Sequence, residues 1–179
     1  MVTGTPKTGV RYSHIKTRDL GEVWFAESER GLWRIEFGRT KERFLADLRR
    51  DGVAGTVDAR ATAKTQKLLT EYFAGKRREF PVKVDWSRVD GFTRKALQIC
   101  ARIPHGKTLS YAEVARRAGS PGGARAVGQA MAKNPFPIVV PCHRVLKSDG
   151  TLGGFSGGLH FKRALLDLEG AKAKPNRAR

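Results

Sequence analysis

The chain has 179 residues, enough for one large domain or two small ones with hydrophobic cores of their own. Lysine and arginine total 35 against 17 acidic residues, so the formal net charge is +18. This excess favours a polyanionic partner, most plainly nucleic acid, with an anionic membrane surface as the competing interpretation. No apolar run approaches the roughly 18 residues of a spanning helix, Met1–His14 lacks the apolar core of a secretory signal, and two cysteines make no disulfide framework. We expect a soluble intracellular protein.

The first half reads as a small α/β domain, residues 1–88, without a chemical motif. Its expected elements are an irregular polar start over residues 1–18, a β-hairpin of strands 22–26 and 32–37 around Ser28–Gly31, helices over 40–50 and 58–73, and a short edge strand over 80–84. The last is placed at an edge because Pro81 cannot donate to a ladder. The aromatic residues of this part are most simply core.

Beyond residue 88 the hydrophobic periodicity becomes helical. Phe92, Ala96, Ile99 and Cys100 share one helix face, which makes Cys100 a packed core thiol. His105 lies close by in sequence, but two ligands are too few for a structural zinc site. No metal or other cofactor is therefore expected.

A pair of short helices is predicted from residue 110 onward. Ser110–Glu113 fits a capping box, and that helix should end at Gly119. Ser120 is expected to cap a second helix that begins at Pro121. Two helices joined by a glycine-containing turn make a helix-turn-helix. In the second helix Ala124, Val127 and Met131 should face inward, and Gly122, Arg125 and Gln129 outward. Small residues around one arginine suit close approach to a DNA groove, although a solvated Arg125 is the simpler alternative.

The stretch from Ile138 to Val145 carries the chemistry. The β-branched run Ile138–Val140 should be extended and buried, and should break at Pro141. Cys142 then lies beside His143 and Arg144, and electropositive surroundings lower the pKa of a cysteine. The alternative is a cysteine that merely packs. Asn134, upstream, is either an ordinary helix-stop residue or a clamp that holds this turn by side-chain to backbone hydrogen bonds.

The end of the chain contains a glycine-rich loop, a helix and a basic tail. The loop 150–158 includes the string G-x-S-x-G, but no buried strand precedes it, so a hydrolase elbow is rejected, as is a phosphate-binding loop. A helix is expected over 159–169. Glu169 at its C-terminus needs a donor or cation, for which His143 is the candidate. Residues 171–179 are expected to be a disordered basic tail.

Together these residues resemble the O6-alkylguanine-DNA alkyltransferases, the methylated-DNA–protein-cysteine methyltransferases. The matching strings, in the family's order and spacing, are Ile103-Pro104-His105-Gly106, Ser110-Tyr111, Ala124-Arg125-Ala126-Val127-Gly128, Asn134-Pro135, Pro141-Cys142-His143-Arg144-Val145, Ser156-Gly157-Gly158 and Glu169-Gly170. The resemblance implies an N-terminal α/β domain with a ribonuclease-H-like sheet over residues 1–88 and a mostly α-helical domain with the helix-turn-helix over 89–170. Phe155 departs from the tyrosine of many members.

The resemblance also implies roles for individual residues. Cys142 would accept the alkyl group, with His143 taking its proton through a water and Glu169 orienting the imidazole. Tyr111 would donate a hydrogen bond to the leaving guanine, and Asn134 would hold the turns of the site. Arg125 would fill the gap left by a flipped nucleotide, and Ala126 would allow close packing in the minor groove. The expected DNA contacts are completed by Tyr111, Gly122, Gln129 and Arg144, and the expected substrate pocket consists of Val145, Phe155, Ser156 and Gly157.

The predicted function is therefore stoichiometric transfer of the alkyl group from O6-alkylguanine, with O4-alkylthymine as a second substrate, to Cys142, which inactivates the protein irreversibly. The expected partner is double-stranded DNA carrying the lesion and no membrane, bound by a monomer, with cooperative assembly on DNA left open. The protein would be cytoplasmic and nucleoid-associated in a prokaryote, or nuclear in a eukaryote. The rival readings are a DNA-binding regulator without catalysis and a multiple-turnover cysteine hydrolase.

Overall fold

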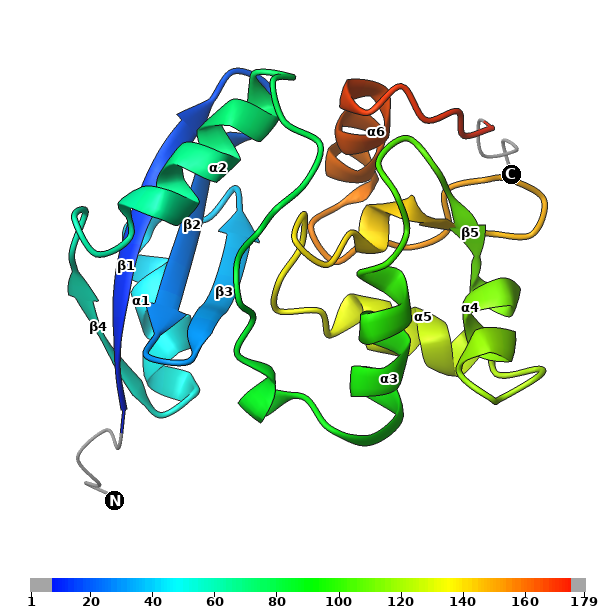
Figure 1. Cartoon of the computed structure of the whole chain (residues 1–179), viewed down its shortest axis with the longest axis horizontal. Coiled ribbons are helices and arrows are strands. Elements are labelled where there is room, and N and C mark those ends of the chain that lie inside the picture. Colours follow the sequence, from blue (N-terminus) through cyan, green and yellow to red (C-terminus); the bar gives the residue numbers. More distant parts are fainter. Residues whose placement is uncertain (1–7, 175–179) are drawn as a thin grey trace. The chain divides into compact units, whose positions relative to one another are not determined.

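The chain divides into two compact units, residues 1–85 and 86–179, where the sequence placed the end of the first domain at residue 88. The structure is a computed structural model that describes residues 8–174 (Figure 1). Among those residues, no helix combines the length and the apolar character that crossing a lipid bilayer requires.

The first unit is a four-stranded sheet with two helices (Figure 1). Its strands are β1 (Thr8–Thr17), β2 (Gly21–Ser28), β3 (Gly31–Phe37) and β4 (Val53–Val57), in the order β3-β2-β1-β4. The antiparallel pair β2–β3 is the predicted hairpin, and β1 is antiparallel to β2 and parallel to β4. The predicted α/β class of this domain is confirmed.

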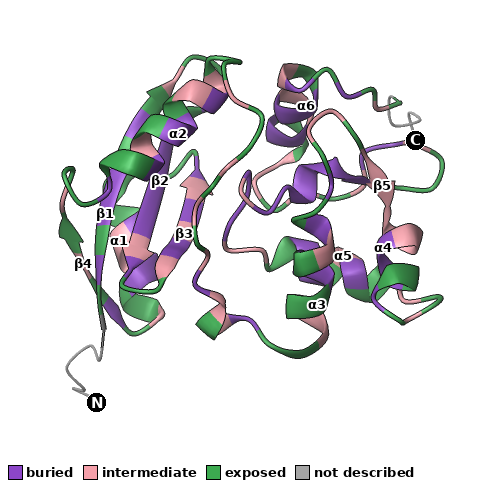
Figure 2. Cartoon of the chain, in the orientation of Figure 1, coloured by how far each residue is buried: buried purple, intermediate pink, exposed green. Residues whose placement is uncertain are grey.

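Its helices are α1 (Lys41–Arg50) and α2 (Ala63–Phe73). The side chain of Thr40 caps α1 by accepting a hydrogen bond from the backbone N–H of Arg43 at 3.3 Å. Phe44 on α1 packs against the rings of Tyr12 and Trp24 on the sheet. All four residues of the β2 segment 23–26 are buried, so both faces of the sheet are covered (Figure 2).

Four expectations for this unit were wrong in detail. Residues 8–17 form a strand. The sequence pattern hides it, because the alternation of buried and exposed residues shifts phase after Tyr12. Residues 1–7 lie outside the described part. β4 was missed. The helix expected from Asp58 begins at Ala63, since the Asp58 carboxylate accepts from the Ala61 N–H at 2.8 Å and holds a turn there. The expected edge strand 80–84 is reduced to one bridge between Val84 and Leu32.

The second unit is mostly helical, as predicted. Its elements are α3 (Gly91–Cys100), α4 (Tyr111–Arg117), α5 (Ala124–Ala132), α6 (Leu159–Leu168), the 3-10 turns η1 (Trp86–Arg88) and η2 (Cys142–Arg144), and the two-residue parallel strands β5 (Leu109–Ser110) and β6 (Val145–Leu146). The capping box of Ser110 and Glu113 is present at the start of α4, and α4 packs against α5 as the predicted helix-turn-helix.

The second helix of this motif begins at Ala124, not at Pro121. Gly122 has φ +83°, which a helix does not allow, and the N–H of Gly123 donates to the carbonyl of Ser120 at 2.9 Å. Ser120 therefore closes a turn and does not cap the helix with its side chain. Gly122 lies in that turn and not on the outer face of α5, contrary to the prediction.

The beginning of the predicted disordered tail is ordered. Ala171 is buried, the N–H of Lys174 donates to the carbonyl of Gly150 at 2.9 Å, and Lys174 forms a bridge with Thr151. Residues 175–179 lie outside the described part, so the prediction for the rest of the tail stands as made.

Candidate active site

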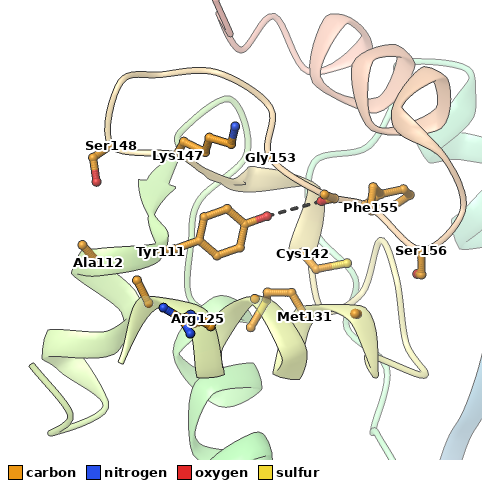
Figure 3. A pocket seen from close by; sticks show the side chains of 14 residues that line it. Tyr111, Ala112, Arg125, Met131, Cys142, Lys147, Ser148, Gly153, Phe155 and Ser156 are labelled. Carbon is orange, nitrogen blue, oxygen red and sulfur yellow. Dashed lines mark hydrogen bonds between the residues drawn. The ribbon is translucent and has the colours of Figure 1, made fainter. Parts of the chain in front are cut away.

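A cavity of about 670 Å³ opens between α4, α5, η2 and the loop before α6, all within the second unit. This volume is in the range of small-molecule sites. Figure 3 shows Tyr111 from α4, Arg125 from α5, Cys142 from η2, and Phe155 and Ser156 from the loop around it. The structure therefore brings together five of the residues singled out in the sequence.

Cys142 is presented by a tight turn and not by the end of a strand, which corrects the prediction for Ile138–Val140. The N–H of Val140 donates to the carbonyl of Phe136 at 2.8 Å. Asn134 clamps the same turn: its Nδ2 donates to the carbonyl of Val140 at 2.8 Å, and its Oδ1 accepts from the N–H of Phe136 at 3.0 Å. The two ends of the loop before Cys142 are thus held by one side chain.

Ile138 shows what holding this turn costs. Its φ is +75°, the one positive value of a non-glycine residue among the described residues. Such a conformation costs about 1–3 kcal/mol for a β-branched residue. Phe136, Ile138 and Val140 are all buried, and burial of each side chain contributes roughly 1.5–3 kcal/mol. Packing therefore outweighs the intrinsic preference of the run for an extended backbone.

The Cys142 thiol is 4% exposed, and burial raises its pKa above the ordinary value. Hydrogen bonding from Asn134 and the positive charge of Lys162 oppose this effect but do not overcome it. The expectation of a lowered pKa is therefore wrong: Cys142 is a neutral thiol that needs a base. The other cysteine, Cys100, is fully buried on α3, as predicted. No cluster of three potential metal ligands occurs within residues 8–174.

The next residue, His143, is the candidate general base. The Nε2 atom of His143 is 2.9 Å from Oε1 of Glu169, and both side chains are fully buried. A carboxylate only accepts hydrogen bonds, so the proton of a neutral imidazole sits on Nε2 and Nδ1 is left as an acceptor. Nδ1 is buried and has no hydrogen-bond partner in the described part of the chain. Burial lowers the pKa of His143, with Glu169 opposing, so the imidazole is neutral at neutral pH and can take a proton.

Glu169 is held by more than the histidine that the sequence suggested. Arg144 donates to it twice, from Nε to Oε2 and from Nη2 to Oε1, both at 2.8 Å, and donates from Nη1 to the carbonyl of Ile103 at 2.5 Å. The N–H of Gly106 also approaches Oε2 at 3.3 Å. Arg144 is 5% exposed, so it cannot serve as the DNA contact that was predicted. Its guanidinium instead balances the buried carboxylate.

The outer face of α5 carries the predicted exposed residues. Arg125, Ala126 and Gln129 are exposed there, and Arg125 also lines the cavity. Phe155 and Ser156 line the cavity as well, whereas Val145 and Gly157 do not. Val145 is fully buried, and its carbonyl is engaged by Lys162.

Tyr111 projects from the start of α4 into the cavity (Figure 3). Its hydroxyl donates to the carbonyl of Gly154 at 3.3 Å. Burial raises its pKa to about 12, so it keeps its proton and remains a donor. The ring needs the glycine at 153: a Cβ there would lie 2.8 Å from a ring carbon of Tyr111.

Lys162 on α6 is a buried site residue that the sequence reading missed. It is fully buried, and its Nζ donates to the carbonyl of Val145 at 2.6 Å. A signal was present, because Lys162 precedes Glu169 by seven residues, which is two helical turns, and so shares its face of the helix. A lysine is rarely fully buried without an acidic partner, so the residue type alone does not point to such a position.

Comparison with known proteins gives the same two parts. Residues 10–86 match the family described as 6-O-methylguanine DNA methyltransferase, ribonuclease-like domain, and residues 91–171 match its DNA binding domain. The methylated-DNA–protein-cysteine methyltransferase of Mycobacterium tuberculosis is 45% identical over 118 residues, 66% of this chain and 71% of that protein. The one of Methanosarcina barkeri is 35% identical over 158 residues, 88% of this chain and 96% of that protein.

Solved structures agree over nearly the whole length. The crystal structure of M. tuberculosis O6-methylguanine methyltransferase has a TM-score of 0.76 at 36% identity and covers 92% of this chain and 95% of that chain. The structure of the M. tuberculosis protein in complex with DNA has the same TM-score at 34% identity, covering 90% and 93%. The chain belongs to the methylated-DNA–protein-cysteine methyltransferase family and is an enzyme of DNA repair.

Proposed function

We propose that the chain repairs O6-alkylguanine in duplex DNA by moving the alkyl group to Cys142, once per molecule. The observation that carries the proposal is a thiol in the wall of a cavity of about 670 Å³, which has room for a base, followed directly by a neutral, buried histidine whose Nδ1 has no partner among the described residues. Displacement at an sp³ carbon requires a strong, soft nucleophile, which a thiolate is.

The proposed step is a displacement at the alkyl carbon by the sulfur of Cys142. The Cys142 proton passes through a water to Nδ1 of His143, and Glu169 stabilises the imidazolium that forms. The sulfur bonds to the alkyl carbon as the bond from that carbon to O6 breaks, and the electron pair stays on guanine. Tyr111 donates a hydrogen bond to the departing base. The base takes up one proton on release from water, and the His143 imidazolium returns its proton to water, so that no net proton is gained or lost. The product is a thioether that nothing in the cavity can hydrolyse, so the protein is inactivated.

DNA is proposed to bind across the outer face of α5. The alkyl carbon is inside the base stack, so the nucleotide must leave the helix, at a cost of a few kcal/mol. Arg125 is exposed on α5 and lines the cavity, which suits it to occupy the vacated space. Ala126 beside it lets the backbone come close to the groove. Gln129 is exposed on the same face and would make a further DNA contact, while Phe155 and Ser156, which line the cavity, would contact the extruded base.

O4-alkylthymine is proposed as a second substrate, since it too presents an alkylated exocyclic oxygen. We also propose a monomer that acts in the cytoplasm on the nucleoid.

Intact-mass spectrometry tests the acceptor. After incubation with excess O6-methylguanine duplex, the protein should gain one methyl group, and peptide mapping should place it on Cys142. Cys142→Ala should gain none, whereas Cys100→Ala, the matched loss of the other buried thiol, should still be methylated. An unmodified protein at excess substrate would reject the proposal.

A binding assay that compares lesion with undamaged DNA separates the first rival, and the stoichiometry of the reaction separates the second. A regulator without catalysis would bind undamaged DNA as well as the lesion and would lose nothing on Cys142→Ala. A cysteine hydrolase would release product repeatedly and carry no lasting modification.

Extrusion of the nucleotide is tested on α5. Arg125→Ala should slow single-turnover methyl transfer from duplex DNA and leave transfer from the free base O6-benzylguanine unchanged, because the free base needs no extrusion. The exposed arginine of the preceding helix, Arg117→Ala, serves as a control for a lost surface charge. Equal slowing on duplex and free base would refute the role of Arg125.

A further inference from the structure

Lys162 is a buried cation with no acidic partner. It is fully buried on α6, and its Nζ donates to the carbonyl of Val145 at 2.6 Å, to the carbonyl of Gly154 at 3.4 Å and to the hydroxyl of Tyr111 at 3.4 Å. It also lies 5.5 Å from the centroid of the Tyr111 ring. No carboxylate in the described residues pairs with it. A buried ammonium held by neutral groups alone is costly, which points to a use at the site.

The geometry sets the direction of the Tyr111 hydroxyl. An ammonium group donates hydrogen bonds and accepts none, so the Tyr111 oxygen must be the acceptor of the contact with Lys162. The single proton of that hydroxyl is therefore directed elsewhere. In this structure it is directed to the carbonyl of Gly154.

We propose that Lys162 is a positioning residue for the methyl transfer, which holds the Tyr111 hydroxyl as a donor toward the base in the cavity. The inference rests on the proposed function, in which Tyr111 donates to guanine as it leaves. Lys162 keeps its own proton throughout and contacts no reacting atom. Its bond to the carbonyl of Val145 fixes the ammonium in place. The Tyr111 oxygen therefore stays an acceptor from Lys162, and its proton is left to turn from the carbonyl of Gly154 to the base.

A dependence on pH follows. Burial lowers the pKa of Lys162 to about 8. The groups that face it are the Tyr111 hydroxyl and the thiols of Cys142 and Cys100, and its charge also acts on His143. Once deprotonated, the amine carries a lone pair that can accept the Tyr111 proton. The hydroxyl then turns toward Lys162 and the base loses its donor.

Single-turnover methyl transfer from duplex O6-methylguanine, followed between pH 6 and 9.5, tests this role. The wild-type rate should fall as the pH rises through about 8, and Tyr111→Phe should remove that fall. Lys162→Met should be slower by roughly 10- to 100-fold, the loss of one hydrogen bond with a charged partner, and Tyr111→Phe on top of it should add little. Lys162→Arg, which stays charged, should recover part of the rate and lose the fall. Arg163→Met, next to it on α6, should behave as wild type.

A thermal melt separates positioning from a structural role. Lys162→Met removes a buried charge that has no acidic partner among the described residues, so it should melt no lower than wild type although it is slower. A lower melting temperature with additive rate losses in the double variant would refute the proposal, and so would a wild-type rate that stays flat through pH 8. A wild type that never methylates Cys142 would instead refute the proposed function, and this inference with it.

Discussion

Glu169→Gln should destabilise the second unit far more than its small change in shape suggests. The Glu169 carboxylate accepts two hydrogen bonds from Arg144 and one from His143, all within 2.9 Å, and the groups are buried. The amide keeps the shape but leaves the Arg144 guanidinium as an unbalanced buried charge. Breaking a buried pair in this way costs about 3–5 kcal/mol. For a chain of this length that is a fall in melting temperature of roughly 6–20 °C.

The assay is chemical and thermal denaturation at pH 7, followed by fluorescence. Glu113→Gln is the matched control, because its carboxylate caps α4 at a half-buried site and should cost about 1 kcal/mol or less. Glu169→Gln combined with Arg144→Met removes both charges and should lose less stability than Glu169→Gln alone. The reasoning is refuted if Glu169→Gln costs no more than the control, or if the double variant loses the sum of the single losses.

Three further outcomes are expected. Asn134→Ala should cost about 1–3 kcal/mol in denaturant unfolding, since it removes two hydrogen bonds that hold a strained turn, and it should also slow methylation of Cys142; unchanged stability would contradict this. Because the folded pKa of His143 is lowered, the unfolded chain takes up a proton first, so stability should fall as the pH drops below about 6.5, and His143→Gln should flatten that slope between pH 6.5 and 5. Gly153→Ala should slow methyl transfer because its Cβ meets the Tyr111 ring, whereas Gly154→Ala, with open space, should not; equal rates would remove the packing explanation.

Local signals in the sequence predicted the elements that depend on local chemistry. The capping box at Ser110 and the hairpin turn at Ser28–Gly31 involve neighbours in the chain, and both are present in the structure. The family strings that contain Tyr111, Arg125, Cys142 and Ser156 located cavity residues for the same reason, because each of them marks a short segment that contributes to the lining of the site.

The failures involve contacts between distant residues. Arg144 was predicted to contact DNA. The sequence alone does not show that Glu169, 25 residues later in the chain, lies within hydrogen-bond distance of it. The thiol of Cys142 was expected to be acidic because its charged neighbours are visible in the sequence and its burial is not. Ile138–Val140 was read as a strand from intrinsic preference, which the burial of the turn overrides. The start of α5 was misplaced because Pro121 suits a first helical turn, while Gly122 and Gly123 allow a different one.

The shortness of α5 bears on how this protein finds damage. Nine residues at 1.5 Å each extend about 14 Å, which is the height of roughly four stacked base pairs. Alanine and glycine are prominent along α5, and Arg125 is its long cationic side chain. A helix this short therefore has few groups with which to distinguish one base sequence from another. We expect α5 to contact DNA weakly and without preference for base sequence. The protein would then search by attempting to extrude one base after another, and would stop only where the extruded nucleotide fits the cavity.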